Sequence, residues 1–111
     1  AIMGTMPDDL AHVLQQLRAG LEAQYGDRLD RVLLYGSRAR GDATPESDVD
    51  VLVVLEGEVD ALAEIHRNSH LVAGLSLEHD LVISCVYLSA EELQEGDDPF
   101  LRNVRREAVA V

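Results

Sequence analysis

The chain contains no lysine: its nine basic residues are all arginines, against 21 acidic residues and a formal net charge of −12. Such a surface repels the phosphate backbone of nucleic acids, so we expect no autonomous binding of DNA or RNA. The absence of lysine also excludes a P-loop, because the sequence GxxxxGKS or GxxxxGKT requires one. The acidic surface would suit a basic protein partner, although it also keeps a small protein in solution.

Cysteine and long apolar runs are scarce as well. The single cysteine, Cys85, lies in an apolar run, which indicates a small core residue rather than a nucleophile or a redox centre. No run approaches the roughly 20 apolar residues of a membrane span, and no signal-peptide pattern is present. We therefore expect one domain over residues 1–111 that is cytoplasmic, makes no membrane contact and begins with a disordered segment at 1–6.

One stretch, residues 31–55, carries most of the information. It reads as a strand, a tight turn at Gly36-Ser37, a loop, and a second strand that opens with Asp48-Val49-Asp50. Because side chains alternate along a strand, Asp48 and Asp50 point the same way, roughly 7 Å apart. That spacing suits a pair of divalent cations, and hard carboxylate oxygens favour Mg²⁺ or Mn²⁺.

The turn supplies the other half of such a site. Glycine at position 36 lets the backbone approach a ligand closely, and the residues after it can start a helix whose free N–H groups hold phosphate oxygens. Ser37 adds a hydroxyl donor at the same place. The stretch therefore predicts a triphosphate cradle that faces a pair of metal ligands.

Apolar periodicity and turn signals place the remaining elements. Leucine and valine residues at helical spacing predict a first helix whose apolar face covers the sheet. A second helix is expected to turn Leu62 and Ile65 inward, and Ser89-Ala90-Glu91-Glu92 matches a capping box that starts a short helix. The predicted helices are 8–25, 58–74, one from Ser89 and one from Pro99, and the predicted strands are 31–35, 49–55 and 77–88.

The spacing Gly36-Ser37, ten residues, Asp48-x-Asp50 resembles the GSx10DxD signature of the DNA polymerase β-like nucleotidyltransferase superfamily. The fuller string GSRARGDATPESDVDVLVV resembles the minimal nucleotidyltransferases, the MntA-type antitoxins encoded beside small helical HEPT toxins. The final segment PFLRNVRREAVAV resembles their closing segment, so the resemblance covers about residues 31–111. It implies an α/β (α+β) fold with a small mixed sheet flanked by helices.

The resemblance also implies a set of site residues. A third carboxylate comes from an adjoining strand in the superfamily, and Asp80 is the candidate because it opens an apolar run; Glu78 is the reserve. Asp48, Asp50 and Asp80 would hold two Mg²⁺ ions, with Mn²⁺ as the alternative, and Asp80 would help to deprotonate the acceptor. The residues implied in nucleotide and phosphate binding are Gly36, Ser37, Arg38, Arg40 and Ser47.

The implied reaction transfers AMP from ATP to a hydroxyl acceptor and releases pyrophosphate. Larger relatives carry a further helical domain that helps to bind the acceptor, so here the acceptor would come from a homodimer mate, a partner protein or a small molecule. The resemblance favours a tyrosine of a HEPT-type toxin, which would make the chain an antitoxin. Two alternatives are a non-catalytic antitoxin that masks its partner and a stand-alone nucleotidyltransferase that acts on a small molecule.

Overall fold

The computed structural model describes residues 8–44 and 46–111, so the disorder predicted for residues 1–6 lies outside the described part. One mixed sheet has the strand order β3-β2-β1-β4. Its strands are β1 (Leu29–Tyr35), β2 (Val49–Leu55), β3 (Ile83–Ser89) and β4 (Val109–Ala110). The helices are α1 (Asp8–Tyr25), η2 (Gly26–Arg28), α2 (Ser37–Arg40), α3 (Ala61–Arg67), α4 (Ser69–His79), α5 (Ala90–Glu95) and α6 (Pro99–Glu107).

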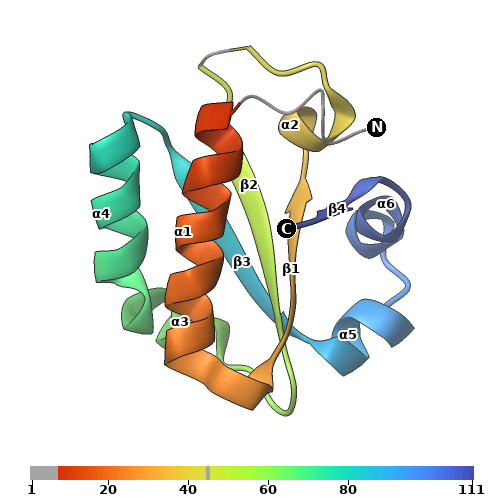
Figure 1. Ribbon diagram of the computed structural model, residues 1–111. Coiled ribbons are helices and arrows are strands. Elements are labelled where there is room, and N and C mark those ends of the chain that lie inside the picture. Colours follow the sequence, from red (N-terminus) through yellow and green to blue (C-terminus); the bar gives the residue numbers. More distant parts are fainter. Residues whose placement is uncertain (1–7, 45) are drawn as a thin grey trace.

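Two layers of helices enclose this sheet, with α1, α3 and α4 on one face and α5 and α6 on the other (Figure 1). The short helix α2 lies at the end of the sheet where β1 ends. This arrangement confirms the α/β class with a small mixed sheet flanked by helices.

Strand pairing fixes which residues meet at each end of the sheet. β1 and β2 are antiparallel, and the Cα partner of Tyr35 is Asp50. β2 and β3 are parallel, with Val49 beside Ile83 and Asp50 beside Ser84. The end of β1 and the starts of β2 and β3 therefore meet at one end of the sheet, which we call the motif end. The opposite end, where β2 and β3 finish, is called the far end.

Strand β2 is covered on both faces, and its side chains alternate between two cores. Val51 and Val53 belong to the core under α1 and α4, whereas Leu52 and Val54 belong to a second core under α5 and α6. The predicted apolar face of α1 is confirmed. Its buried residues are Leu10, Val13, Leu14, Leu17 and Leu21.

The single helix predicted over 58–74 is wrong, because α3 and α4 are separate helices that meet at Asn68. The buried Asn68 side chain donates to the carbonyl of Glu64 and to the hydroxyl of Tyr25. These polar residues occupy the inward face of α3, so Leu62 and Ile65 point to solvent, 65% and 50% exposed, instead of inward.

The strand predicted over 77–88 begins too early. Residues 77–79 form the last turn of α4, and β3 starts only at Ile83. The helix extends past Gly74 because Leu75 is buried in the core beneath α1 and α4, at helical spacing from the partly buried Leu71. It ends at Asp80, whose φ of 54° is left-handed, and the amide of Leu81 donates to the carbonyl of Ser76.

The C-terminal segment was predicted in part. The capping box at Ser89 and the helix from Pro99 are both confirmed, but α6 ends at Glu107 and the edge strand β4 was missed. Two residues are too few for a period-2 pattern to show. None of the described helices has the length and apolar character that a membrane span requires.

Candidate functional site

Gly36 forms the turn between β1 and α2. Its φ of 77° lies in the left-handed region, and its carbonyl accepts hydrogen bonds from the amides of Ala39 and Arg40 at 3.1 and 3.2 Å. A Cβ built on Gly36 would lie 2.5 Å from Oδ2 of Asp50. Glycine is therefore required here twice, once by the backbone conformation and once by the closeness of the carboxylate.

The turn presents Ser37 at the first position of α2. Within residues 8–44 and 46–111, neither the Ser37 amide nor its hydroxyl has a hydrogen-bond partner. Free N–H groups at such a position are the donors that hold phosphate oxygens. The predicted helical start after Ser37 is thus confirmed, and its free donors lie next to the turn that contacts Asp50.

Asp48 directly precedes β2 and Asp50 is the second residue of that strand, and the two carboxylates are close enough for their charges to interact. Leu52 and Val54 lie in the core beneath α5 and α6, so by alternation Asp50 points toward the same side and Val49 toward the other. Asp50 is half-buried, whereas Asp48 is exposed. Burial raises the pKa of the Asp50 carboxyl, the negative charge of Asp48 raises it further, and Arg40 lowers it.

Asp80 does not lie on a strand beside this pair. It is the C-terminal cap of α4, and the residue that neighbours Asp50 on β3 is Ser84. Glu78, the reserve candidate, is exposed in α4 and lies 3.4 Å from His79. Throughout the described ranges, no three His, Cys, Asp or Glu side chains gather closely enough to hold a metal ion. Asp48 and Asp50 are therefore brought together, but Asp80 does not form a three-residue metal-binding group with them.

Ser84 and Tyr35 flank Asp50 on the two neighbouring strands, and the sequence did not single out either residue. Their positions depend on the register of β1, β2 and β3, which no local pattern reveals.

The two arginines after the turn have different partners. Both Nε and Nη2 of Arg38 donate to the carbonyl of Ser47, at 3.1 and 2.9 Å. The Ser47 hydroxyl in turn accepts from the amide of Thr44 at 2.9 Å. Arg38 and Ser47 therefore hold the loop that leads directly into Asp48.

Arg40 bridges α2 to the last helix. Its guanidinium lies 3.4 Å from Asp42 and 3.6 Å from Glu107 at the end of α6. Because it lowers the pKa of Asp50, Arg40 is the cation that partly offsets the two carboxylates. It is exposed, so it remains accessible to a charged ligand.

The carboxylate pair fits a magnesium ion by its chemistry. Burial is the main cause of the raised pKa of Asp50, and repulsion by the neighbouring Asp48 carboxylate adds to it; a divalent cation relieves that repulsion. Mg²⁺ is commonly bound by one or two carboxylates, with substrate phosphates and water completing its octahedron. Asp48 and Asp50 are thus the residues that could serve as protein ligands for an ion that arrives with a nucleotide.

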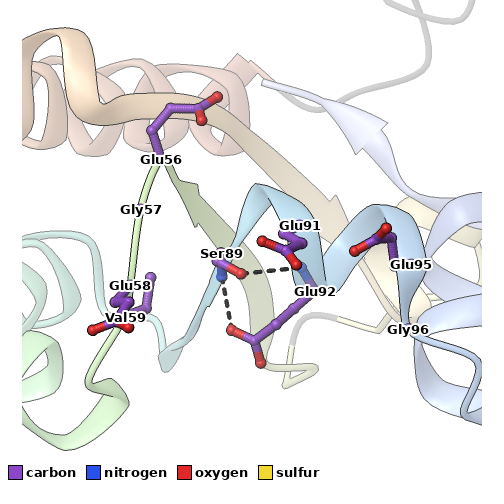
Figure 2. A pocket seen from close by; sticks show the side chains of 9 residues that line it. All are labelled: Glu56, Gly57, Glu58, Val59, Ser89, Glu91, Glu92, Glu95 and Gly96. Carbon is purple, nitrogen blue, oxygen red and sulfur yellow. Dashed lines mark hydrogen bonds between the residues drawn. The ribbon is translucent and has the colours of Figure 1, made fainter.

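Two sizeable surface hollows lie away from this pair, toward the far end. One, of 720 Å³, is lined by the β2–α3 turn and by α5, and its rim carries Glu56, Glu58, Glu91, Glu92 and Glu95 (Figure 2). The other, of 850 Å³, includes Leu33, Glu91 and Arg105 in its lining. The larger hollows are therefore not where the chemically distinctive residues lie. The glutamates of the far end are exposed or used as helix caps, whereas Asp50 is half-buried beside a second carboxylate, so we take the carboxylate pair as the candidate site.

Known proteins similar to this chain agree with the fold and the motif. A model of the nucleotidyltransferase domain matches residues 14–109. Two proteins of Methanocaldococcus jannaschii, each named "Putative protein adenylyltransferase", are 36% identical over 76 residues and 34% identical over 88 residues. The first alignment covers 68% of this chain and 76% of the relative, and the second covers 78% and 82%.

Solved structures share the fold at low identity. A crystal structure of a "putative nucleotidyltransferase" from Sulfolobus solfataricus has a TM-score of 0.59 and 21% identity, over 95% of this chain and 78% of that one. A crystal structure of a toxin–antitoxin with AMP-PNP has a TM-score of 0.58 and 19% identity, over 85% and 68%. Because the family model spans most of the described residues, and because the turn and carboxylate pair of the motif are assembled, the chain belongs to the nucleotidyltransferase domain family.

Proposed function

We propose that this nucleotidyltransferase transfers AMP from ATP, with Mg²⁺, to a hydroxyl group of a protein partner. The observation that carries the proposal is the approach of Asp50 to the Gly36 turn, with the charge of Asp48 acting on Asp50. In the proposed site, this carboxylate pair would hold the metal while the free donors of the turn bind phosphate. The names of the two M. jannaschii relatives support a protein as the acceptor.

In the proposed reaction the acceptor oxygen forms a bond to the α-phosphorus of ATP. The bond between that phosphorus and the oxygen bridging to the β-phosphate breaks, and pyrophosphate leaves. The Ser37 amide and hydroxyl bind the phosphates, and Arg40 neutralises part of their charge. Asp48 and Asp50 would hold the magnesium, which stabilises charge on the phosphoryl oxygens when bound.

Asp80 remains our proposed acceptor of the proton from the attacking hydroxyl. Two residues separate it from Ile83, and the intervening Val82 accepts a hydrogen bond from the amide of Val49 at 2.8 Å. Asp80 therefore belongs to the motif end, although it reaches that end from the cap of α4 and not from a strand. Its proposed role is that of a general base from the rim of the site.

The proposed partner is a helical HEPT-type toxin, and the proposed acceptor is a tyrosine of that toxin. Two of the solved structures that share this fold are toxin–antitoxin complexes, one of them with AMP-PNP. Transfer of AMP would add a negatively charged, bulky group to the toxin and so neutralise it. The chain would then act as an antitoxin by catalysis.

The direct test uses purified protein, Mg²⁺, the product of the adjacent gene and ATP labelled on either the α- or the γ-phosphate. We expect label from the α-phosphate to move to the partner, while label from the γ-phosphate appears in pyrophosphate. Transfer of γ-label would indicate a kinase and contradict the proposal. Tyrosine as the acceptor is checked by the mass and fragmentation of the modified peptide.

A further inference from the structure

The chain has one phenylalanine, Phe100, and that side chain is 43% exposed. It lies in the first turn of α6, which Pro99 begins and the Asp98 side chain caps by accepting from the Leu101 amide at 2.9 Å. Leu101 and Val104 bury the inner face of this helix. The capped helix start therefore holds an aromatic ring that is partly exposed to solvent and that is not among the buried residues of the two described cores.

The Phe100 ring contacts the site through Tyr35. The two ring centroids are 5.5 Å apart, and the planes meet at 82°. Tyr35 is the last residue of β1 and the Cα partner of Asp50. The aromatic pair thus borders Asp50 on the same face of the sheet.

The other end of α6 reaches the site as well. Glu107 lies 3.6 Å from Arg40, the residue whose charge acts on Asp50. Glu107 lies seven positions after Phe100, which is a helical rise of about 10 Å. Helix α6 therefore runs along the border of the site, with an aromatic ring at its start and an acid–arginine pair at its end.

Resting on the proposed function, we infer that Phe100, steadied by Tyr35, is the stacking surface for the adenine base of the bound nucleotide. An exposed aromatic ring presents a π-face to a nucleobase, and such stacking tolerates different bases because each base has its own π-face. The phosphates would lie on the Gly36 turn while the base lies toward α6. In this arrangement no side chain has to form hydrogen bonds to the base.

The other large apolar side chains that are exposed within residues 8–44 and 46–111 do not compete for this role. They are aliphatic and belong to α3, α4 and the approach to β3: Leu62, Ile65, Leu77 and Val82. Phe100 differs from them in two ways, because it is aromatic and because its ring contacts a neighbour of Asp50. These differences favour a nucleobase over a protein surface as the ligand of Phe100.

The test compares the dissociation constants of Mg-ATP and of inorganic tripolyphosphate with Mg²⁺, measured by calorimetry on the full chain. Wild-type protein should bind Mg-ATP more tightly than tripolyphosphate. Phe100→Ala should weaken Mg-ATP about tenfold and leave tripolyphosphate unchanged, as expected for loss of a base-stacking ring. Leu77→Ala, which removes an exposed apolar side chain elsewhere, should change neither constant.

Two conservative variants separate stacking from packing. Phe100→Leu keeps an apolar side chain against Tyr35 but has no π-face, whereas Phe100→Tyr keeps the ring. The inference requires that Phe100→Leu lose affinity for Mg-ATP and that Phe100→Tyr retain it. Wild-type affinity in Phe100→Leu, or equal weakening of both ligands by Phe100→Ala, would overturn it.

The same titrations separate this inference from the proposed function. If wild-type protein binds tripolyphosphate as tightly as Mg-ATP, the base contributes nothing, so the stacking surface is wrong and the phosphate site stands. If it binds neither ligand, both the stacking surface and the nucleotide-transfer proposal fail.

Discussion

The two ends of the sheet both carry several carboxylates, yet they differ in what holds those carboxylates. At the motif end, Asp48 and Asp50 repel each other, and the half-buried Asp50 lies against a glycine with left-handed geometry. At the far end, Glu92 closes a capping box with Ser89. A cluster of acidic residues therefore does not by itself indicate a functional site. Carboxylates that are held close together at a cost in stability do indicate one.

Hydrogen bonds at the far end tie elements together. Arg28 donates to the carbonyl of Glu56 at 2.9 Å and also to the carbonyl of Glu58. Nearby, the Tyr25 hydroxyl donates to the buried Glu64 carboxylate at 2.5 Å and accepts from Asn68 at 2.7 Å. We infer that the far end stabilises the fold and that the motif end performs the chemistry.

The largest effect should come from the carboxylate pair. Asp48→Asn and Asp50→Asn should each lower the rate of AMP transfer at least about a hundredfold, because each removes a charge that the metal requires. The double variant Glu91→Gln/Glu95→Gln, at the far end, should stay within about twofold of wild type, as surface changes usually do. A comparable loss in this double variant would contradict the assignment of roles to the two ends.

Glycine replacements compare the two ends of the sheet by their effect on the free energy of unfolding. Gly36→Ala should lower the free energy of unfolding by about 2–3 kcal/mol, from the left-handed φ and the contact with Asp50 together. Gly57→Ala is a matched control at the far end, with φ of 83° and nothing within 4 Å of the added Cβ, and it should cost only about 1 kcal/mol. Urea denaturation measures both values, and equal costs would mean that the Asp50 contact is readily relieved.

The loop before Asp48 should matter for rate more than for binding. Arg38→Ala removes the hydrogen bonds to the Ser47 carbonyl, so it should lower the rate constant about tenfold with little change in the dissociation constant of Mg-ATP. Arg102→Ala, an exposed change with only a 3.8 Å ion pair to Asp97, should be neutral. A raised dissociation constant in Arg38→Ala would show instead that this arginine binds phosphate.

The smallest effect that we expect is a change in the free energy of unfolding at alkaline pH, caused by Tyr25 at the far end. Burial, and then the hydrogen bond to Glu64, raise the pKa of Tyr25 from 10.0 to about 12, so the folded chain holds this proton more tightly than the unfolded chain does. The stability that this group contributes is fully present below pH 10 and is lost as pH rises through 12.

Tyr25→Phe should therefore cost about 1 kcal/mol at pH 7, from the lost hydrogen bond, and should fall off less steeply with pH than wild type. The absence of lysine leaves mainly tyrosine and Cys85 to titrate in this window, which simplifies the measurement. Parallel pH profiles for the two proteins would show that the Tyr25 hydrogen bond does not shift this pKa.

The sequence predicted the motif end well because its signals are local. Gly36, Ser37, Asp48 and Asp50 lie within fifteen consecutive residues, and their spacing alone predicts that the two carboxylates come close together. The first helix and both caps of the C-terminal helices follow from equally local patterns. The family resemblance rested on the same residues, and the match to the nucleotidyltransferase domain confirms it.

The features that the sequence did not predict depend on tertiary contacts, which no local pattern reveals. Asn68 divides a predicted helix because its amide bonds to Tyr25, 43 positions earlier in the chain. Asp80 looked like the start of a strand because apolar residues follow it, but a left-handed helix cap fits the same letters. Phe100 reaches Tyr35 across 65 positions, so its place beside the site could be found only in the fold.

The most direct measurement locates the metal ion that binds with the nucleotide, without reference to any acceptor. Amide spectra of this 12.1 kDa chain would be recorded with AMP-PNP and a trace of Mn²⁺, whose unpaired electrons broaden signals from nearby residues. We predict the strongest broadening at Gly36, Ser37, Asp50 and Ser84, with signals at Gly57 and Glu91 unaffected. Broadening centred on the glutamate-lined hollow of the far end would contradict the central claim.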